Sequence, residues 1–259
     1  MAATQHMRMS RLDLDLDSAP DEELPGYEAS TAPAYESGAY DEPLVTYRLR
    51  QYDRKIQMLA AQGVAAASSY RFTTHGFRLF SRKPEMEVLY TSQEMRQRMM
   101  ATISYQSDGP LPWRPRAYFN HTASDGRDTR CDMESRNFVD WSFVANGRTY
   151  IWRLAMGPVS LVLAELGMSV PIARFTYSEV GALAERGAEI GELTIFRDWL
   201  TVDQNGIDWL VCGLMVALTY AKKMGKYYRN EANDLERRNS LTRELSPVQR
   251  ASLAGAPSF

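Results

Sequence analysis

Basic side chains are the residues of this chain whose types and spacing best fit a defined chemistry, the binding of phosphate. A guanidinium group offers planar, paired donors that match a phosphate, and an indole ring beside it suits a membrane interface. Trp113 directly precedes Arg114, and further cations follow a predicted turn at His75-Gly76. The competing interpretation is a set of scattered, solvated arginines. The anionic-lipid patch expected from the sequence consists of Arg78, Arg82, Lys83, Arg114 and Arg116.

Residues for acid–base, nucleophilic or metal chemistry are sparse. The chain has three histidines and two cysteines, and it contains no HExxH, no G-x-S-x-G and no glycine-rich phosphate loop. His121 and Asp125 are spaced as a base and an orienting carboxylate, but a polar loop pair is the preferred interpretation. A metal site needs three or four convergent ligands, and none can be assembled. We therefore expect a protein that is not an enzyme, with no cofactor and no bound metal.

Short motifs near both ends indicate a partner and modification sites. Residues 24–28 read LPGYE and residues 32–36 read APAYE, two P-x-Y units each followed by glutamate. The first resembles the ligands of WW domains, such as those of HECT-type ubiquitin ligases, whereas the second departs from that pattern and low complexity alone is the alternative. The motifs RRNS and SP predict phosphorylation sites. The residues concerned are Pro25, Tyr27, Pro33 and Tyr35 for the WW ligand, and Ser240 and Ser246 for phosphorylation.

Charge and composition divide the chain into three parts. Residues 1–43 hold two basic and ten acidic side chains, a charge of −8, and are expected to form a disordered acidic tail. The rest holds 28 basic and 22 acidic residues, a charge of +6. That excess favours anionic lipid, although an ordinary surface is the simpler interpretation and no specific nucleic acid is expected. The predicted domain spans residues 44–229, and residues 230–259 are predicted to be a flexible polar tail.

Cysteine content and the first residues indicate the compartment. Cys131 and Cys212 show no convincing pairing, which favours a reducing environment. Residues 1–18 lack the apolar stretch of a secretory signal. The expected location is the cytoplasm, with attachment to the plasma membrane or presence in the nucleus left open.

Short alternations of apolar and polar residues predict strands throughout the body of the chain. The clearest is a hairpin in which positions 139, 141 and 143 share one face and positions 150, 152 and 154 share the returning face. Asn146-Gly147 between them suits a type I′ turn, because both positions of that turn need positive φ. An antiparallel sandwich or barrel is therefore expected. Further strands are predicted at Leu161–Leu163, Ala173–Tyr177, Leu193–Phe196 and Trp199–Val202.

One segment breaks the alternation and predicts a helix at about 206–226. Its apolar residues lie all round the helix, which is typical of a membrane span or of a helix enclosed by protein. Ile207–Ala221 reaches only about 22 Å, whereas a bilayer core needs about 30 Å, so no transmembrane span is expected. An all-β protein encloses such a helix by wrapping its sheet around it. Asp203 and Asn205 are candidate caps. Four cations follow the apolar run, where the helix dipole favours positive charge and where they suit anionic lipid. They are Lys222, Lys223, Lys226 and Arg229.

This order of elements resembles the tubby C-terminal fold, shared with phospholipid scramblases and LURP-one-related proteins, and particularly its divergent fungal members. The resemblance covers about residues 70–226. It implies a closed antiparallel β-barrel of about twelve strands around a central hydrophobic C-terminal α-helix. The residues that carry it are Tyr150–Arg153, Val159–Ala164, Ile172–Phe175, Gly191–Ile195 and Asp208–Tyr220.

Three functional hypotheses follow from these patterns. The first is a non-enzymatic intracellular binding module, a peripheral membrane protein that recognises anionic phospholipid head groups of the phosphoinositide kind. The second is an adaptor that recruits a WW-domain protein through its P-x-Y repeats. The third, with the least support, is a scramblase-like lipid-transfer protein.

Overall fold

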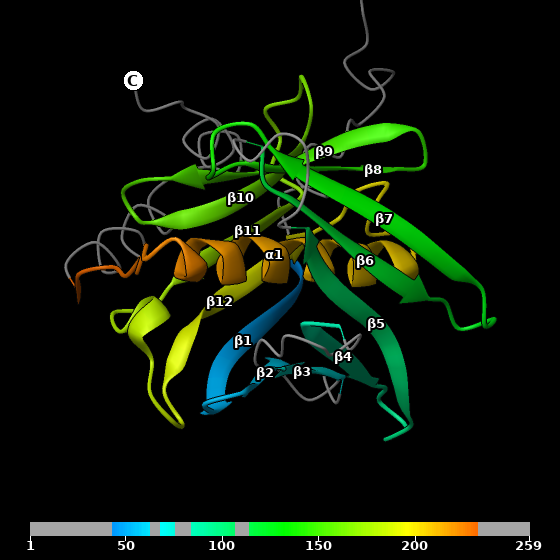
Figure 1. Ribbon diagram of the computed structural model, residues 1–259, viewed down its shortest axis with the longest axis horizontal. Helices are drawn as coiled ribbons and strands as arrows, with labels where there is room; N and C mark the ends of the chain where they lie inside the picture. The colour runs from blue at the N-terminus through cyan, green and yellow to red at the C-terminus, as the bar shows by residue number, and fades with distance from the viewer. Residues whose placement is uncertain (1–42, 63–67, 76–83, 107–113, 233–259) are drawn as a thin grey trace, which may run out of the picture. The chain divides into compact units, whose positions relative to one another are not determined.

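Twelve strands close into an antiparallel barrel in a computed structural model of the chain (Figure 1). The structure describes residues 43–62, 68–75, 84–106 and 114–232. Each strand pairs with its neighbours in sequence, and β1 closes the barrel by pairing with β12, so the predicted fold is confirmed. The strands are β1 (Pro43–Asp53), β2 (Ile56–Ala61), β3 (Ser69–Thr74), β4 (Met86–Thr91), β5 (Gln97–Gln106), β6 (Arg116–Thr122), β7 (Asp128–Ser135), β8 (Trp141–Ala145), β9 (Arg148–Ala155), β10 (Ser160–Glu165), β11 (Ala173–Tyr177) and β12 (Glu189–Phe196).

The predicted hairpin is β8–β9. Trp141 is opposite Trp152 and Phe143 is opposite Tyr150, and all four side chains are buried inside the barrel. Asn146 and Gly147 have φ of +50° and +76°, the positive values that a type I′ turn requires. The four large aromatic residues at alternate positions and the Asn-Gly turn therefore predict this register correctly.

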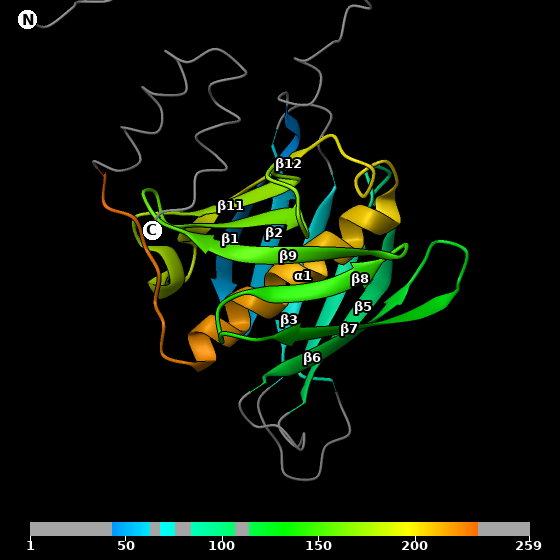
Figure 2. The ribbon, with the colours of Figure 1, turned by 90° about the horizontal axis from the view of Figure 1, so that it is seen from above.

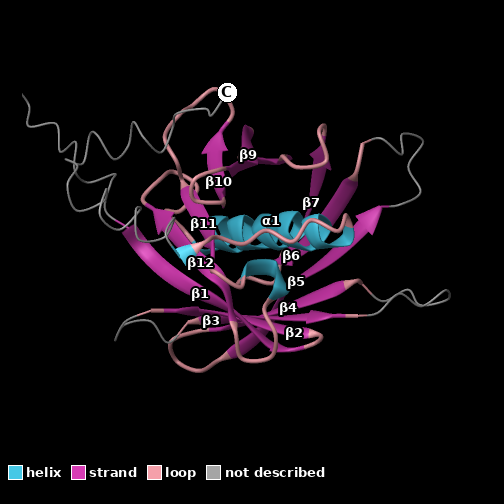
Figure 3. Ribbon diagram, turned by 90° about the vertical axis from the view of Figure 1, so that its left-hand side faces the viewer, coloured by secondary structure: helices cyan, strands magenta, loops and turns pink. Residues whose placement is uncertain are grey.

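The helix α1 (Gln204–Lys223) runs through the barrel, with strands on all sides (Figures 2 and 3). Asp203 is its N-cap and accepts a hydrogen bond from the Gly206 N–H at 2.7 Å, whereas Asn205, the other candidate, lies inside the helix. All eight residues from Leu210 to Ala217 are buried, which confirms that the helix is enclosed on every side. Within the described residues, no helix has both the length and the apolar character needed to cross a bilayer.

Gly213 is a point of close approach between the helix and the barrel wall. A Cβ atom there would lie 3.0 Å from the indole nitrogen of Trp152 and 3.3 Å from the Phe143 ring. The absence of a side chain at this position lets two large aromatic residues of β8 and β9 pack against the helix backbone.

The strand predicted at Trp199–Val202 is wrong. Asp198 and Thr201 make a local turn there, in which the Asp198 carboxylate accepts from Leu200 N–H at 2.9 Å and the Thr201 hydroxyl accepts from Asp198 N–H at 2.8 Å. Such side-chain bonds to nearby backbone compete with strand pairing. Leu200 and Thr201 are buried between the exposed Trp199 and Val202, and the segment leads the chain into α1.

A strap (residues 224–230, orange in Figure 1) follows the helix and is fixed by Asn230. The Asn230 side chain is buried, donates to the carbonyls of Val159 at 3.0 Å and Tyr177 at 2.7 Å, and accepts from Val159 N–H at 2.6 Å. Asn230 is thus part of the folded barrel, although the sequence predicts that a flexible tail begins there.

Replacing Asn230 by alanine should lower the free energy of unfolding by about 2–4 kcal/mol, because three backbone groups lose a buried partner. Urea denaturation of the Asn230→Ala variant measures the loss. Arg229→Ala is the matched control, since Arg229 is exposed and should change stability by less than about 0.5 kcal/mol. Equal midpoints for the two variants would show that the strap is not held by Asn230.

Candidate functional site

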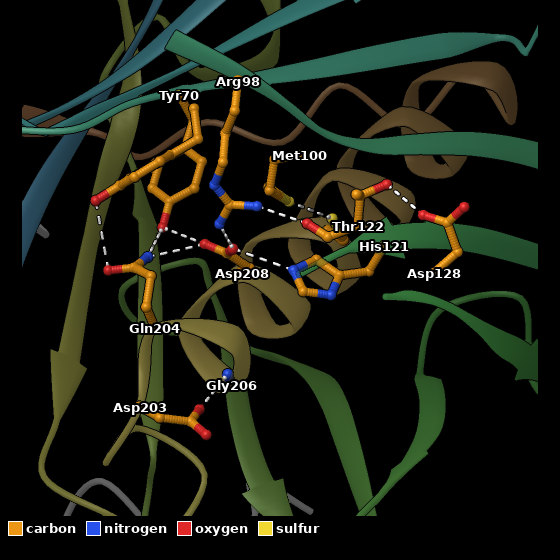
Figure 4. A network of polar contacts seen from close by, with 12 residues as sticks. Tyr70, Arg98, Met100, His121, Thr122, Asp128, Asp203, Gln204, Gly206 and Asp208 are labelled. Carbon is orange, nitrogen blue, oxygen red and sulfur yellow. Dashed lines mark hydrogen bonds and ion pairs between the residues drawn. The ribbon is translucent and has the colours of Figure 1, made fainter. Parts of the chain in front are cut away.

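Polar side chains gather at both ends of α1, and the first group surrounds Asp208 near the amino end (Figure 4). The Asp208 side chain has no exposed surface. Its Oδ1 accepts from the Tyr70 hydroxyl at 3.0 Å and the Gln204 amide at 2.8 Å. Its Oδ2 lies 2.7 Å from Arg98 Nη2 and 3.1 Å from His121 Nε2. These partners come from β3, β5, β6 and the helix itself.

The hydrogen bonds and ion pairs of Asp208, which we call the Asp208 network, connect elements of the fold. Each carboxylate oxygen has two partners, so its acceptor capacity is filled from within the protein. Burial, followed by the charge of Asp208, raises the pKa of Tyr70 well above its ordinary value, so the hydroxyl stays a donor. Arg98 also donates to the carbonyl of Thr122 at 2.5 Å. The network joins three strands to the start of α1 and leaves the carboxylate no free lone pair for a substrate.

His121 is not in a loop, and its predicted pairing with Asp125 is wrong. His121 lies inside the barrel on β6 with 1% of its surface exposed, and its partner is Asp208. Asp125 is exposed in the β6–β7 turn and pairs with Arg127 at 2.8 Å. The alternation of Ala117, Phe119 and His121 along β6 turns this histidine inward.

Both cysteines lie buried as free thiols. Burial raises the pKa of Cys131 to about 12 and that of Cys212 well above its ordinary value, so both thiols are poor nucleophiles at neutral pH. Among the described residues, no group of three or more His, Cys, Asp or Glu side chains is arranged to hold a metal ion.

The second group of polar residues surrounds a pocket of about 490 Å³ at the carboxyl end of α1, which we call the basic mouth. Its rim carries four cations, two from the β1–β2 turn, one from the last turn of α1 and one from the strap. Amide and hydroxyl side chains of β1, β2 and β3 form one wall, and apolar side chains form the floor. The rim residues are Arg54, Lys55, Lys222 and Lys226, the wall residues include Gln51, Gln57 and Thr74, and the floor residues include Leu49, Tyr177, Ala182, Ile190 and Leu218.

The hollow exists because the two sides of the helix end are filled differently. On one side Tyr220 packs edge-on against Trp141 at 5.0 Å and stacks with Tyr105 at 6.5 Å between ring centroids. Lys223 belongs to that side, since it pairs with Glu85 and lies 3.7 Å from the centre of the Tyr105 ring. On the other side smaller amide and hydroxyl side chains leave space beside the helix.

The electrostatics of the basic mouth favour an anion. Among the described residues no acidic side chain lines it, and none of its four charged groups has a carboxylate oxygen within 4 Å. The nearest acidic residue along the chain is Asp53, whose carboxylate accepts from the Arg54 backbone N–H at 2.6 Å. The carboxyl end of α1 contributes roughly half a negative charge, which four full positive charges outweigh. Burial, and next the neighbouring Tyr228, raise the pKa of Tyr177, so its hydroxyl adds no negative charge at neutral pH.

The structure describes only part of the predicted lipid patch. Arg114 is exposed, and Arg116 is half-buried and aligned with Glu134 of β7. Arg116 lines a groove of about 670 Å³ on the outer face of β6–β9, which it shares with Asp132, Glu134 and Asp140, so that groove has mixed charge. The predicted residues that lie outside the described ranges are Arg78, Arg82, Lys83, Pro25, Tyr27, Pro33, Tyr35, Ser240 and Ser246.

Sequence reasoning identified one half of the basic mouth and missed the other. Lys222 and Lys226 were visible as cations after a helix. Arg54 and Lys55 were not singled out, although the D-R-K sequence between two alternating stretches is a turn signal. Only closure of the barrel brings this turn to the carboxyl end of α1.

Comparisons of the chain with protein-family models, with curated proteins and with solved structures find no match. Membership of the tubby-like superfamily therefore stays a proposal based on the order and hydrophobicity of the elements.

Proposed function

We propose that this protein is a non-enzymatic binding module that attaches to anionic phospholipid through the basic mouth. The observation that carries the proposal is a rim of four cations whose charged groups have no ion-pair partner among the described residues. Arginine binds phosphate through paired donors, and lysine binds it as a point charge.

Exposed apolar and aromatic residues beside the rim support a membrane as the source of the phosphate. Tyr52 precedes the β1–β2 turn, and Met224 and Tyr227 flank Lys226 on the strap. Each of these three side chains is about half exposed or more. Tyrosine is favoured at the level of lipid head groups, and an exposed methionine adds apolar contact.

The side chains of the basic mouth support binding without catalysis. The described lining contains amides, hydroxyls and cations, but no histidine or carboxylate that would act as a general base. The buried histidine and its carboxylate partner are committed to the Asp208 network.

Removing two rim charges should weaken binding to anionic vesicles by about 30-fold. Each lysine near an anionic surface contributes about 1 kcal/mol, and about 1.4 kcal/mol corresponds to tenfold in affinity. The Lys222→Gln/Lys226→Gln variant and the wild type are compared by co-sedimentation with phosphatidylcholine vesicles that contain or lack phosphatidylserine or phosphatidylinositol phosphate. Binding of the wild type should also decline as salt is raised.

The matched control removes the same charge from the opposite end of the barrel. Arg96 and Arg127 are exposed in the β4–β5 and β6–β7 turns, and each has an acidic partner at the surface. The Arg96→Gln/Arg127→Gln variant should bind vesicles as the wild type does. Equal losses in both double variants, or wild-type binding that ignores lipid charge, would reject the basic mouth as the site.

A further inference from the structure

The floor of the basic mouth is apolar, and a head group bound at the rim alone would leave that floor unused. Leu218 lies one helical turn inward from Lys222, about 6 Å along the axis, and forms the floor with Ala182 and Ile190. Next along the same face of α1 is Leu214, which is fully buried and belongs to the closed core. The apolar part of the mouth is therefore about one helical turn deep.

The wall of the mouth is closed where β1 meets β12. β1 stays paired with β12 through Leu49 and Gly191. Beyond that pair, Gln51 N–H donates to the Ala188 carbonyl at 3.0 Å and Gly187 N–H donates to the Gln51 carbonyl at 2.6 Å. A ligand therefore cannot enter between these two strands, and the four cations line the pocket at the end of the barrel.

We infer that the basic mouth binds a monomeric phosphorylated amphiphile, with its phosphate at the rim and a short apolar segment against the floor. This inference rests on the proposed function and specifies the ligand of the same site. The pocket volume of about 490 Å³ lies within the range of small-molecule sites. A lipid in a bilayer presents its head group to the protein and keeps its chains behind the phosphate. A ligand that fills both rim and floor therefore has to be free in solution or withdrawn from the membrane.

The test is a calorimetric titration of the full chain with methyl, butyl and octyl phosphate, each below its aggregation concentration. Burial of a methylene group strengthens binding about fourfold, so butyl phosphate should bind at least about tenfold more tightly than methyl phosphate. Octyl phosphate should gain little more, because the floor is only one turn deep. Equal affinities for the methyl and butyl esters would overturn this inference and leave the anion site intact. If none of the three esters binds, both the inference and the proposed function fail.

Two variants separate the rim from the floor. Ala182→Leu adds volume to the floor and should reduce the affinity for butyl phosphate to that for methyl phosphate, without changing the latter. The Lys222→Gln/Lys226→Gln variant should lose affinity for both esters by the same factor. If a folded Ala182→Leu variant binds butyl phosphate with the affinity of the wild type, the assignment of the floor is wrong. If that variant fails to fold, the comparison of esters on the wild type still decides the question.

Discussion

Replacing Leu214 by aspartate is expected to leave the chain unfolded. Leu214 is fully buried, and its neighbours on α1 from Leu210 to Ala217 are buried as well, so a charge there finds neither water nor a partner. Loss of a buried leucine costs about 2–5 kcal/mol, and an unpaired buried carboxylate costs several more. A domain has only about 5–15 kcal/mol of stability in total, which this single change exhausts.

Far-UV circular dichroism and the soluble yield of Leu214→Asp test this expectation. Leu183→Asp is the matched control, since Leu183 is half exposed and its replacement should preserve folding. A Leu214→Asp variant that stays soluble and folded, and loses only its association with membranes, would mean that α1 is not the core of the barrel.

Removing the carboxylate of Asp208 is expected to cost about 3–5 kcal/mol, the second largest effect. Asp208→Ala leaves Arg98 and the buried His121 and Tyr70 without their shared acceptor. Replacing the ion pair as a whole should cost less than breaking it, so Asp208→Leu/Arg98→Leu should recover part of the loss. Asp125→Ala is the control, because it removes an exposed carboxylate from an exposed pair and should cost less than about 1 kcal/mol.

Urea denaturation of these variants, combined with the vesicle assay, separates a structural role from a functional one. We expect Asp208→Ala to lose stability while the fraction that remains folded binds vesicles normally. An Asp208→Ala variant with wild-type stability and no ligand binding would place the functional site at the amino end of α1 instead.

The fold was predictable where the hydrophobic pattern is local. The β8–β9 hairpin combines four large inward aromatic residues with an Asn-Gly turn, and α1 contains an apolar run, Leu210–Leu218, that is too short for a bilayer. β6 and β7 were not predicted, because their inward positions include Ala117, His121 and Ser135, which carry little hydrophobic signal. The segment Trp199–Val202 was predicted as a strand but forms a turn, in which Leu200 is buried.

The polar sites were less predictable because they depend on contacts between distant parts of the chain. Asp208 meets Tyr70, Arg98 and His121 across separations of 138, 110 and 87 residues. The basic mouth likewise joins the β1–β2 turn to the end of α1. A single sequence shows the residue types in such clusters but not the closure of the barrel that assembles them.

The most direct test of the basic mouth is a two-dimensional amide NMR titration of the full chain with glycerol 3-phosphate. The amides of Arg54, Lys55 and Lys226 should shift in a saturable way, and those of Arg96 and Arg127 at the other end of the barrel should not. Absence of saturable shifts at the three mouth residues, or larger shifts at the opposite end, would contradict anion binding at the carboxyl end of α1.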